Sequence, residues 1–196
     1  VGKTKNLPER LKQHAKDVWR LYTGVLIAIN QKISCSLVNL LSDLEIIWTL
    51  CSAKHHSVLL GVCYRPPNSC RDFSNNLNDV LNEVTKKYPN APVVLFGDFN
   101  FPGINWLNQT MPSQAQGKAG AFLDVCLNFN LLQMVSAPTR VTQECENILD
   151  LILTSHPDDM VSINYLPEIS DHKVIHTEFA FKPLIHQNTQ KIIRLY

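Results

Sequence analysis

A short motif that directly follows an apolar run constrains this chain most strongly. Gly97-Asp98-Phe99-Asn100 comes after Val93-Val94-Leu95-Phe96, a run typical of a buried strand. Asp98 and Asn100 are two residues apart, so at the exit of a strand both side chains can point into one pocket. Far downstream, Ser170-Asp171-His172 places a carboxylate beside an imidazole. Together the two motifs offer a metal anchor, an oriented polar side chain and a general base, a set that suits hydrolysis of a phosphate ester.

Each motif taken alone also has a purely structural interpretation. An Asp-x-Asn pair after a strand is often a turn, because both residue types bend chains readily. Ser170-Asp171 can cap the segment that follows it. Tyr64, at the end of another apolar run, can be a core ring with its hydroxyl at the rim. It is the order of the motifs along the chain that favours a catalytic site.

Composition sets limits on the class of protein. The 196 residues predict one domain with a sizeable core, and 18 basic against 17 acidic residues give a net charge of +1, which by itself does not indicate nucleic-acid binding. The six cysteines show no CxxC pair and no zinc spacing, so buried free thiols in a reducing compartment are expected. No apolar run approaches the roughly 20 residues that cross a membrane.

Strand and helix patterns interleave along the chain, which predicts an α/β fold. Helices are expected at residues 7–22, 72–88 and near 119–128, and strands at 25–29, 44–50, 58–64, 93–96, 131–135, 148–154, 161–166 and 173–181. The run at 25–29 is expected to be covered on both faces. In the strand at 148–154, Asp150 points away from Leu149 and Leu151, between two isoleucines. A carboxylate there is costly unless it is paired or bound to metal.

The order of these motifs resembles that of the endonuclease/exonuclease/phosphatase superfamily, which has the deoxyribonuclease I-like fold. More narrowly, the chain is similar to the apurinic-type endonuclease domain of non-LTR (LINE-type) retrotransposons. The motifs that carry the resemblance are Gly61-Val62-Cys63-Tyr64-Arg65-Pro66-Pro67, Gly97-Asp98-Phe99-Asn100, Asn147-Ile148-Leu149-Asp150-Leu151-Ile152-Leu153-Thr154 and Ser170-Asp171-His172. Pro102–Trp106 and Ala137-Pro138-Thr139-Arg140 fit the retrotransposon branch. Trp48 and Trp106 are expected to pack in the core, and Trp106 has the alternative of lining a DNA groove.

The resemblance implies a two-sheet β-sandwich flanked by helices, with the active site at one mouth. It implies that Asp98 and Asn100 contact the scissile phosphate and the attacking water, and that Tyr64 leans on the phosphate. By the same resemblance His172 is the catalytic histidine and Asp150 the acid that fixes its tautomer. Asp171 corresponds to a metal-site carboxylate. Mg²⁺ or Mn²⁺ is the implied cofactor, DNA the implied partner, and a monomeric intracellular protein, nuclear or cytoplasmic and without membrane attachment, is expected.

The start of the chain departs from the family pattern. The family's first strands carry a catalytic asparagine and a metal-binding glutamate, both expected before Gly24, whereas residues 1–23 are predicted to hold a helix with neither motif. Glu45 comes too late in the chain to be that glutamate. The expected organisation is a non-matching helical segment at 1–23, a partial domain lacking its first strands at 24–182, and a polar tail at 183–196. Three functions stay open: a DNA-nicking endonuclease, a catalytically dead remnant of one, and a phosphoesterase of the same fold that acts on a small phosphoester.

Overall fold

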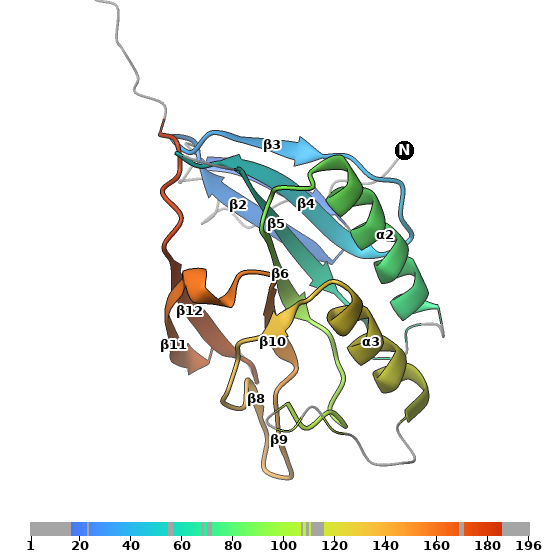
Figure 1. The fold of residues 1–196 in the computed structure, drawn as a ribbon. Coiled ribbons are helices and arrows are strands. Elements are labelled where there is room, and N and C mark those ends of the chain that lie inside the picture. The colour runs from blue at the N-terminus through green and yellow to red at the C-terminus, as the bar shows by residue number, and fades with distance from the viewer. Residues whose placement is uncertain are drawn as a thin grey trace, which may run out of the picture.

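A six-stranded sheet forms the centre of the molecule (Figure 1). The computed structural model describes residues 17–22, 24–54, 57–67, 69, 72–106, 108, 110, 116–168 and 171–185. The sheet has the order β3 (Cys35–Val38), β4 (Glu45–Ser52), β5 (Ser57–Tyr64), β6 (Val93–Asp98), β10 (Asp150–Thr154) and β7 (Leu132–Gln133). β5 and β6 are parallel and the other neighbours are antiparallel.

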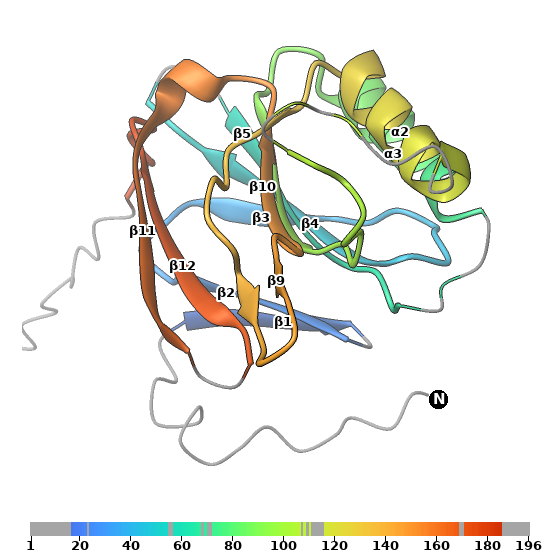
Figure 2. The same ribbon diagram turned by 90° about the horizontal axis from the view of Figure 1, so that it is seen from below.

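Two helices cover one face of this sheet (Figures 1 and 2). α2 (Phe73–Lys87) is the crossover that the parallel β5–β6 pair requires, and α3 (Gln116–Asn128) leads from β6 towards β7. Leu77, Leu81 and Val84 of α2 are buried at helical spacing, as the sequence pattern predicted. They pack with Trp48 and Leu95 of the sheet in the larger core, so Trp48 is confirmed as a packing residue.

Two hairpins cover the opposite face, called here the inner face. One is formed by β1 (Asp17–Tyr22) and β2 (Val25–Asn30), and the other by β11 (Met160–Glu168) and β12 (Lys173–Phe179). β2 contacts β4 and β5, while β11 and β12 enclose a second core around Val94 and Ile152 (Figure 2). A small hairpin of β8 (Arg140–Val141) and β9 (Glu146–Asn147) precedes β10. The α/β class and the β-sandwich arrangement are therefore confirmed, with the second layer built from two separate hairpins.

The N-terminal prediction is wrong over the part that the structure describes. Residues 17–22 form strand β1, which pairs with β2 from Asp17↔Asn30 to Tyr22↔Val25, and residues 7–16 lie outside the described ranges. The segment is rich in residues that favour strands, including Trp19 and Tyr22, and pairing with β2 outweighs the helical spacing of its apolar residues. β2 is also not covered on both faces, because Ala28 is exposed while Val25 is buried.

None of the helices within the described ranges is long and apolar enough to span a membrane.

Candidate active site

Four polar residues lie in one row across the inner face of the central sheet. Register pairs Glu45 with Tyr64, Tyr64 with Asp98, and Asp98 with Asp150, on the adjacent strands β4, β5, β6 and β10. Paired residues on neighbouring strands project to the same face, so these side chains form a continuous polar row. The next positions on this face are apolar, namely Ile47, Val62, Phe96 and Ile152. The polar row thus marks the end of the sheet where the apolar interior gives way to an accessible mouth.

The turn after β6 is built from residues that tolerate unusual backbone angles. Gly97 has φ +150°, and a Cβ there would lie 1.8 Å from the carbonyl oxygen of Cys63 on β5. Asn100 has φ 50°, a left-handed conformation in which asparagine is enriched. The backbone N–H of Asn100 donates to Asp98 Oδ1 at 3.1 Å, and its Nδ2 donates to the carbonyl oxygen of Arg65 at 2.8 Å. The turn therefore fixes both side chains that the motif had singled out.

His172 and Asp150 form a direct pair, with 2.7 Å between His172 Nδ1 and Asp150 Oδ2. Their side chains are 28% and 25% exposed, so the pair is partly desolvated yet open to a substrate. Thr139, fully buried, accepts hydrogen bonds at Oγ1 from the backbone N–H groups of Leu149 and Asp150, both at 3.0 Å. The hydroxyl anchors the start of β10, and so the position of the Asp150 carboxylate. The sequence motif contained Thr139 but gave no sign of this role.

Asp98 completes a compact group with this pair. Ligand atoms of Asp98, Asp150 and His172 all lie within 4.8 Å of one another. Burial raises the pKa of the Asp98 carboxyl, and the neighbouring charge of Asp150 raises it further, while His172 and the Asn100 N–H act in the opposite direction. Two carboxylates held this close favour a bound cation or a shared proton.

Asp171 lies beside this group but is held differently. Its Oδ2 accepts a hydrogen bond from Arg140 Nε at 2.8 Å, and that bond lowers the pKa of the Asp171 carboxyl. The side chains of Arg140 and Asp171 are 41% and 49% exposed, so the ion pair is weak and can exchange with water or a ligand. Arg140 and His172 also form a backbone bridge, which ties β8 to the residue immediately before β12. Ser170, the third residue of this motif, is outside the described ranges.

Glu45 is the residue in the row that sequence reasoning set aside. A Cβ on Gly24 would lie 2.0 Å from Glu45 Oε2 and 3.0 Å from the ring of Tyr64, so the absent side chain at Gly24 makes room for both groups. Glu45 thus comes beside Tyr64 at the mouth even though its place in the chain differs from that of the expected glutamate. Only the register of β4 against β5 reveals this, and no local motif encodes that register.

The donor chemistry of the site fits a divalent metal ion. Within the described ranges, Asp98, Asp150 and His172 are the potential ligands that converge, and Asp171 adds an exposed carboxylate next to His172. Mg²⁺ and Mn²⁺ prefer carboxylate oxygens and retain several waters, so few protein ligands are needed. A cation here would also relieve the repulsion that raises the pKa of Asp98.

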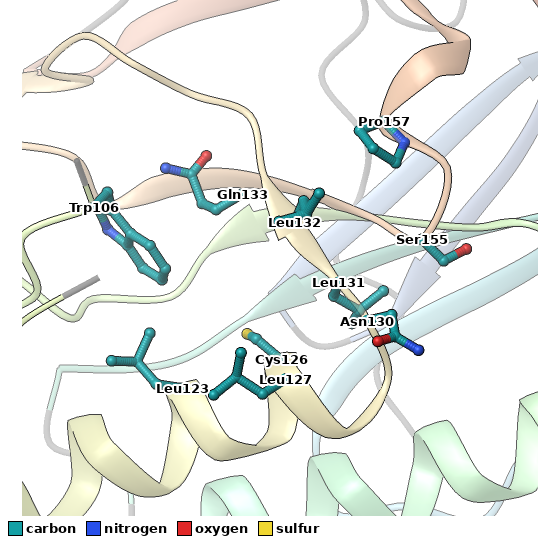
Figure 3. A pocket seen from close by; sticks show the side chains of 10 residues that line it. All are labelled: Trp106, Leu123, Cys126, Leu127, Asn130, Leu131, Leu132, Gln133, Ser155 and Pro157. Carbon is teal, nitrogen blue, oxygen red and sulfur yellow. The ribbon is translucent and has the colours of Figure 1, made fainter. Parts of the chain in front are cut away.

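Trp106 packs away from this mouth. Its ring meets Phe122 of α3 edge-on at 6.3 Å, which confirms the expected packing role. It also lines an apolar cavity of about 330 Å³ with residues of α3, β7 and the segment after β10 (Figure 3). Ser155 and Pro157 border the same cavity, which therefore lies at the end of β10 remote from Asp150.

Comparison with known protein families gives one match. The model of the endonuclease-reverse transcriptase family matches residues 58–176, more than half of the chain. No curated protein sequence matches the chain.

Solved structures share the fold at low sequence identity. The endonuclease domain of TRAS1, a telomere-specific non-LTR retrotransposon, superposes with a TM-score of 0.60 at 12% identity, covering 79% of this chain and 72% of that one. The human Nocturnin catalytic domain with bound sulfate gives 0.58 at 15% identity, over 89% and 76%. The 3′ phosphatase NExo from Neisseria, bound to a product DNA hairpin, gives 0.56 at 14% identity, over 91% and 85%.

The matched segment contains Tyr64, Asp98, Asp150 and His172, the residues that the fold brings to one mouth. The family match and the shared fold support a hydrolase of phosphate esters. This chain belongs to the endonuclease-reverse transcriptase family, within the endonuclease/exonuclease/phosphatase superfamily of deoxyribonuclease I-like fold.

Proposed function

We propose that this chain is a divalent-metal-dependent phosphodiesterase that nicks DNA. The observation that carries the proposal is the convergence of Asp98, Asp150 and His172, with the His172–Asp150 bond at 2.7 Å. Because Nδ1 of His172 is engaged by Asp150, its Nε2 is the ring atom left for a phosphate oxygen. The carboxylate of Asp150 fixes the orientation of the ring, so that an N–H at Nε2 of the imidazolium can donate to a developing negative charge.

The remaining residues have separate tasks in this mechanism. Asp98, once ionised, accepts a proton from the attacking water, and its elevated pKa makes it a stronger base than an exposed aspartate. Asn100 presents its amide to the phosphate from a turn that is already fixed, so little reorganisation accompanies the reaction. Tyr64, in register with Asp98, lies at the mouth where it can contact the phosphate.

A divalent cation would be held by the Asp98 carboxylate, in the group it forms with Asp150 and His172, and by Asp171 next to His172, and would supply charge neutralisation at the phosphate and the leaving oxygen. Arg140 then has a second use. Its bond to Asp171 is largely exposed, so the guanidinium can turn to a phosphate of the DNA backbone.

DNA is the proposed substrate because two structural neighbours point to it. One is a retrotransposon endonuclease domain and the other a phosphatase bound to a DNA product. The description of the matching family also names an endonuclease. A small phosphoester is the competing substrate class. Competition assays separate them, because duplex DNA and not a phosphomonoester should inhibit cleavage of a labelled DNA.

The direct test is nicking of supercoiled plasmid by the purified chain with Mg²⁺ or Mn²⁺. His172→Ala should lower the nicking rate by about 100-fold or more, as expected for loss of a charge-stabilising donor. His176→Ala is the matched control, because His176 is exposed on strand β12, four residues after His172, and pairs with Asn164 of β11. Equal nicking by wild type and His172→Ala would refute the assignment, and a folded wild type that never nicks would favour the dead-remnant alternative.

A further inference from the structure

Arg65 is a buried arginine that directly follows Tyr64 in the polar row. It is 4% exposed, and its guanidinium lies 4.0 Å from the ring centroid of Phe101 and 5.6 Å from that of Phe73. Burying an arginine is costly unless its donors and its charge are matched. The ring faces supply part of the match through cation–π contacts.

Hydrogen bonds of Arg65 to the Asp98–Asn100 turn supply a further part. Nη1 donates to the carbonyl oxygens of Asn100 at 2.9 Å and of Phe99 at 3.3 Å. The backbone N–H of Arg65 donates to the carbonyl oxygen of Asp98 at 2.8 Å. In return Asn100 Nδ2 donates to the carbonyl oxygen of Arg65 at 2.8 Å. Four hydrogen bonds thus join one residue to three consecutive residues of the site.

This turn needs such support. Asn100 is held at φ 50°, a left-handed conformation that asparagine adopts more readily than most residues but that still costs energy relative to the common regions. With one amide donor of Asn100 committed to Arg65, its Oδ1 has a defined direction, and the carbonyl groups bound to Nη1 prevent the turn from relaxing.

From these contacts we propose that Arg65 is a positioning residue, which holds the Asp98–Asn100 turn so that the Asn100 amide meets the phosphate in its reactive geometry. The inference rests on the proposed function for its kinetic consequence, although the contacts themselves do not depend on it. Lysine is an incomplete substitute for Arg65, because its ammonium lacks the planar guanidinium that stacks on the ring of Phe101 while Nη1 donates to both carbonyl oxygens.

The kinetic test is a double-mutant cycle with Asn100→Ala. Arg65→Met, which keeps the length of the side chain without its donors, should lower kcat by about 100-fold with little change in KM, since a displaced catalytic group affects the transition state most. Arg65→Lys should recover part of that loss. In the Asn100→Ala background, Arg65→Met should cost almost nothing further, because the group it positions is already gone.

A control separates positioning from loss of stability. Leu81→Ala, in the fully buried core of α2, removes packing without touching the turn, and at a temperature well below its melting point it should keep the wild-type kcat. Equal losses from Arg65→Met in the wild-type and Asn100→Ala backgrounds would overturn the proposal.

A second readout does not need activity. In ¹H–¹⁵N spectra, the Asn100 side-chain amide should exchange slowly with solvent in wild type, rapidly in Arg65→Met and at an intermediate rate in Arg65→Lys. An unchanged Asn100 amide in both variants would overturn the positioning role. A wild type that shows the protected amide yet never nicks would refute the proposed function alone and leave the positioning role supported.

Discussion

At the scale of single residues, Asp98 lowers the stability of the folded protein at neutral pH. Its carboxyl lies where the apolar inner face ends, and burial together with the charge of Asp150 raises its pKa. The folded protein therefore binds this proton more tightly than the unfolded chain does. As the pH rises from the ordinary aspartate pKa through the elevated one, the unfolded state loses the proton first, so the free energy of unfolding falls.

Asp98→Asn should accordingly abolish nicking and raise the melting temperature at pH 7 by about 1 to 3 °C, because a neutral amide removes the repulsion and keeps an acceptor for the Asn100 N–H. The gain should shrink as the pH falls below the ordinary aspartate range, because Asp98 is then protonated in the wild type as well. Thermal melts of the wild type and of Asp98→Asn, from neutral pH down to acid pH, measure this difference in melting temperature. A variant that melts below wild type at pH 7 would contradict the electrostatic account.

Gly97 offers a second prediction at this scale. Gly97→Ala should destabilise the protein by about 3 kcal/mol or more, since its φ is +150° and the new Cβ would meet the carbonyl of Cys63. Gly117→Ala is the matched control: nothing lies within 4 Å of its Cβ position in α3, and alanine there should stabilise by about 0.5 to 1 kcal/mol. Urea unfolding measures both changes: the free energy of unfolding should fall in Gly97→Ala and rise in Gly117→Ala. A fall of the same size in both variants, or none in Gly97→Ala, would contradict the geometry.

At the scale of elements, long periodic segments were predictable and short ones were not. The apolar face of α2 and the run in β6 identify those elements from sequence alone. β3 and the β8–β9 hairpin, with strands of two to four residues, are too short for a periodic signal. β1 was predicted as a helix because its pairing with β2, which decides the outcome, is a tertiary contact.

The pairing of β3 with β4 leads us to expect that Cys35 and Cys51 can form a disulfide. Cys35 and Cys51 lie directly opposite each other, within reach of a disulfide, while burial and then Cys35 itself raise the pKa of Cys51 to about 11. Both are free thiols; Cys51 is buried, as expected from the sequence, and Cys35 is half-buried. Diamide at pH 8.5 should link them, with two thiols oxidised as diamide is reduced, and raise the free energy of unfolding by about 3 kcal/mol.

Peptide mass spectrometry should show this link between Cys35 and Cys51, which Cys35→Ser removes. It should also show that the exposed Cys145 is alkylated first. Loss of stability on cross-linking would contradict the register.

At the scale of the whole molecule, the site is assembled from segments far apart in the chain. Motifs identified Asp98, Asp150 and His172, because each sits in a recognisable local pattern and the fold brings them within 4.8 Å. Motifs did not identify Glu45 or Arg65 as part of the site. The position of Glu45 depends on strand register, and that of Arg65 on hydrogen bonds between residues 34 or 35 apart in the chain. A local motif therefore predicts the chemical role of one residue, and only the fold shows which residues lie together in one site.

Metal binding depends on the whole fold, because the candidate ligands come from separate segments of the chain. Mn²⁺ or Mg²⁺ should raise the melting temperature by mass action, by an amount equivalent to about 2.7 kcal/mol when the ion is at 100 times its Kd. Asp98→Asn and Asp171→Ala should reduce that response, whereas Glu178→Ala, exposed on β12, should retain it. Calorimetric titration provides the same comparison without heating, and equal responses from all four proteins would place the ion elsewhere.

The polar row has an evolutionary consequence. Its members lie at the rim of the sheet and contribute little to either core, and Asp98 even opposes folding at neutral pH. Under relaxed selection, substitutions in the row would spread without loss of the fold, and some would be favoured because they stabilise it. Among copies of such a domain, catalysis would therefore decay before structure, and intact cores would outnumber intact active sites.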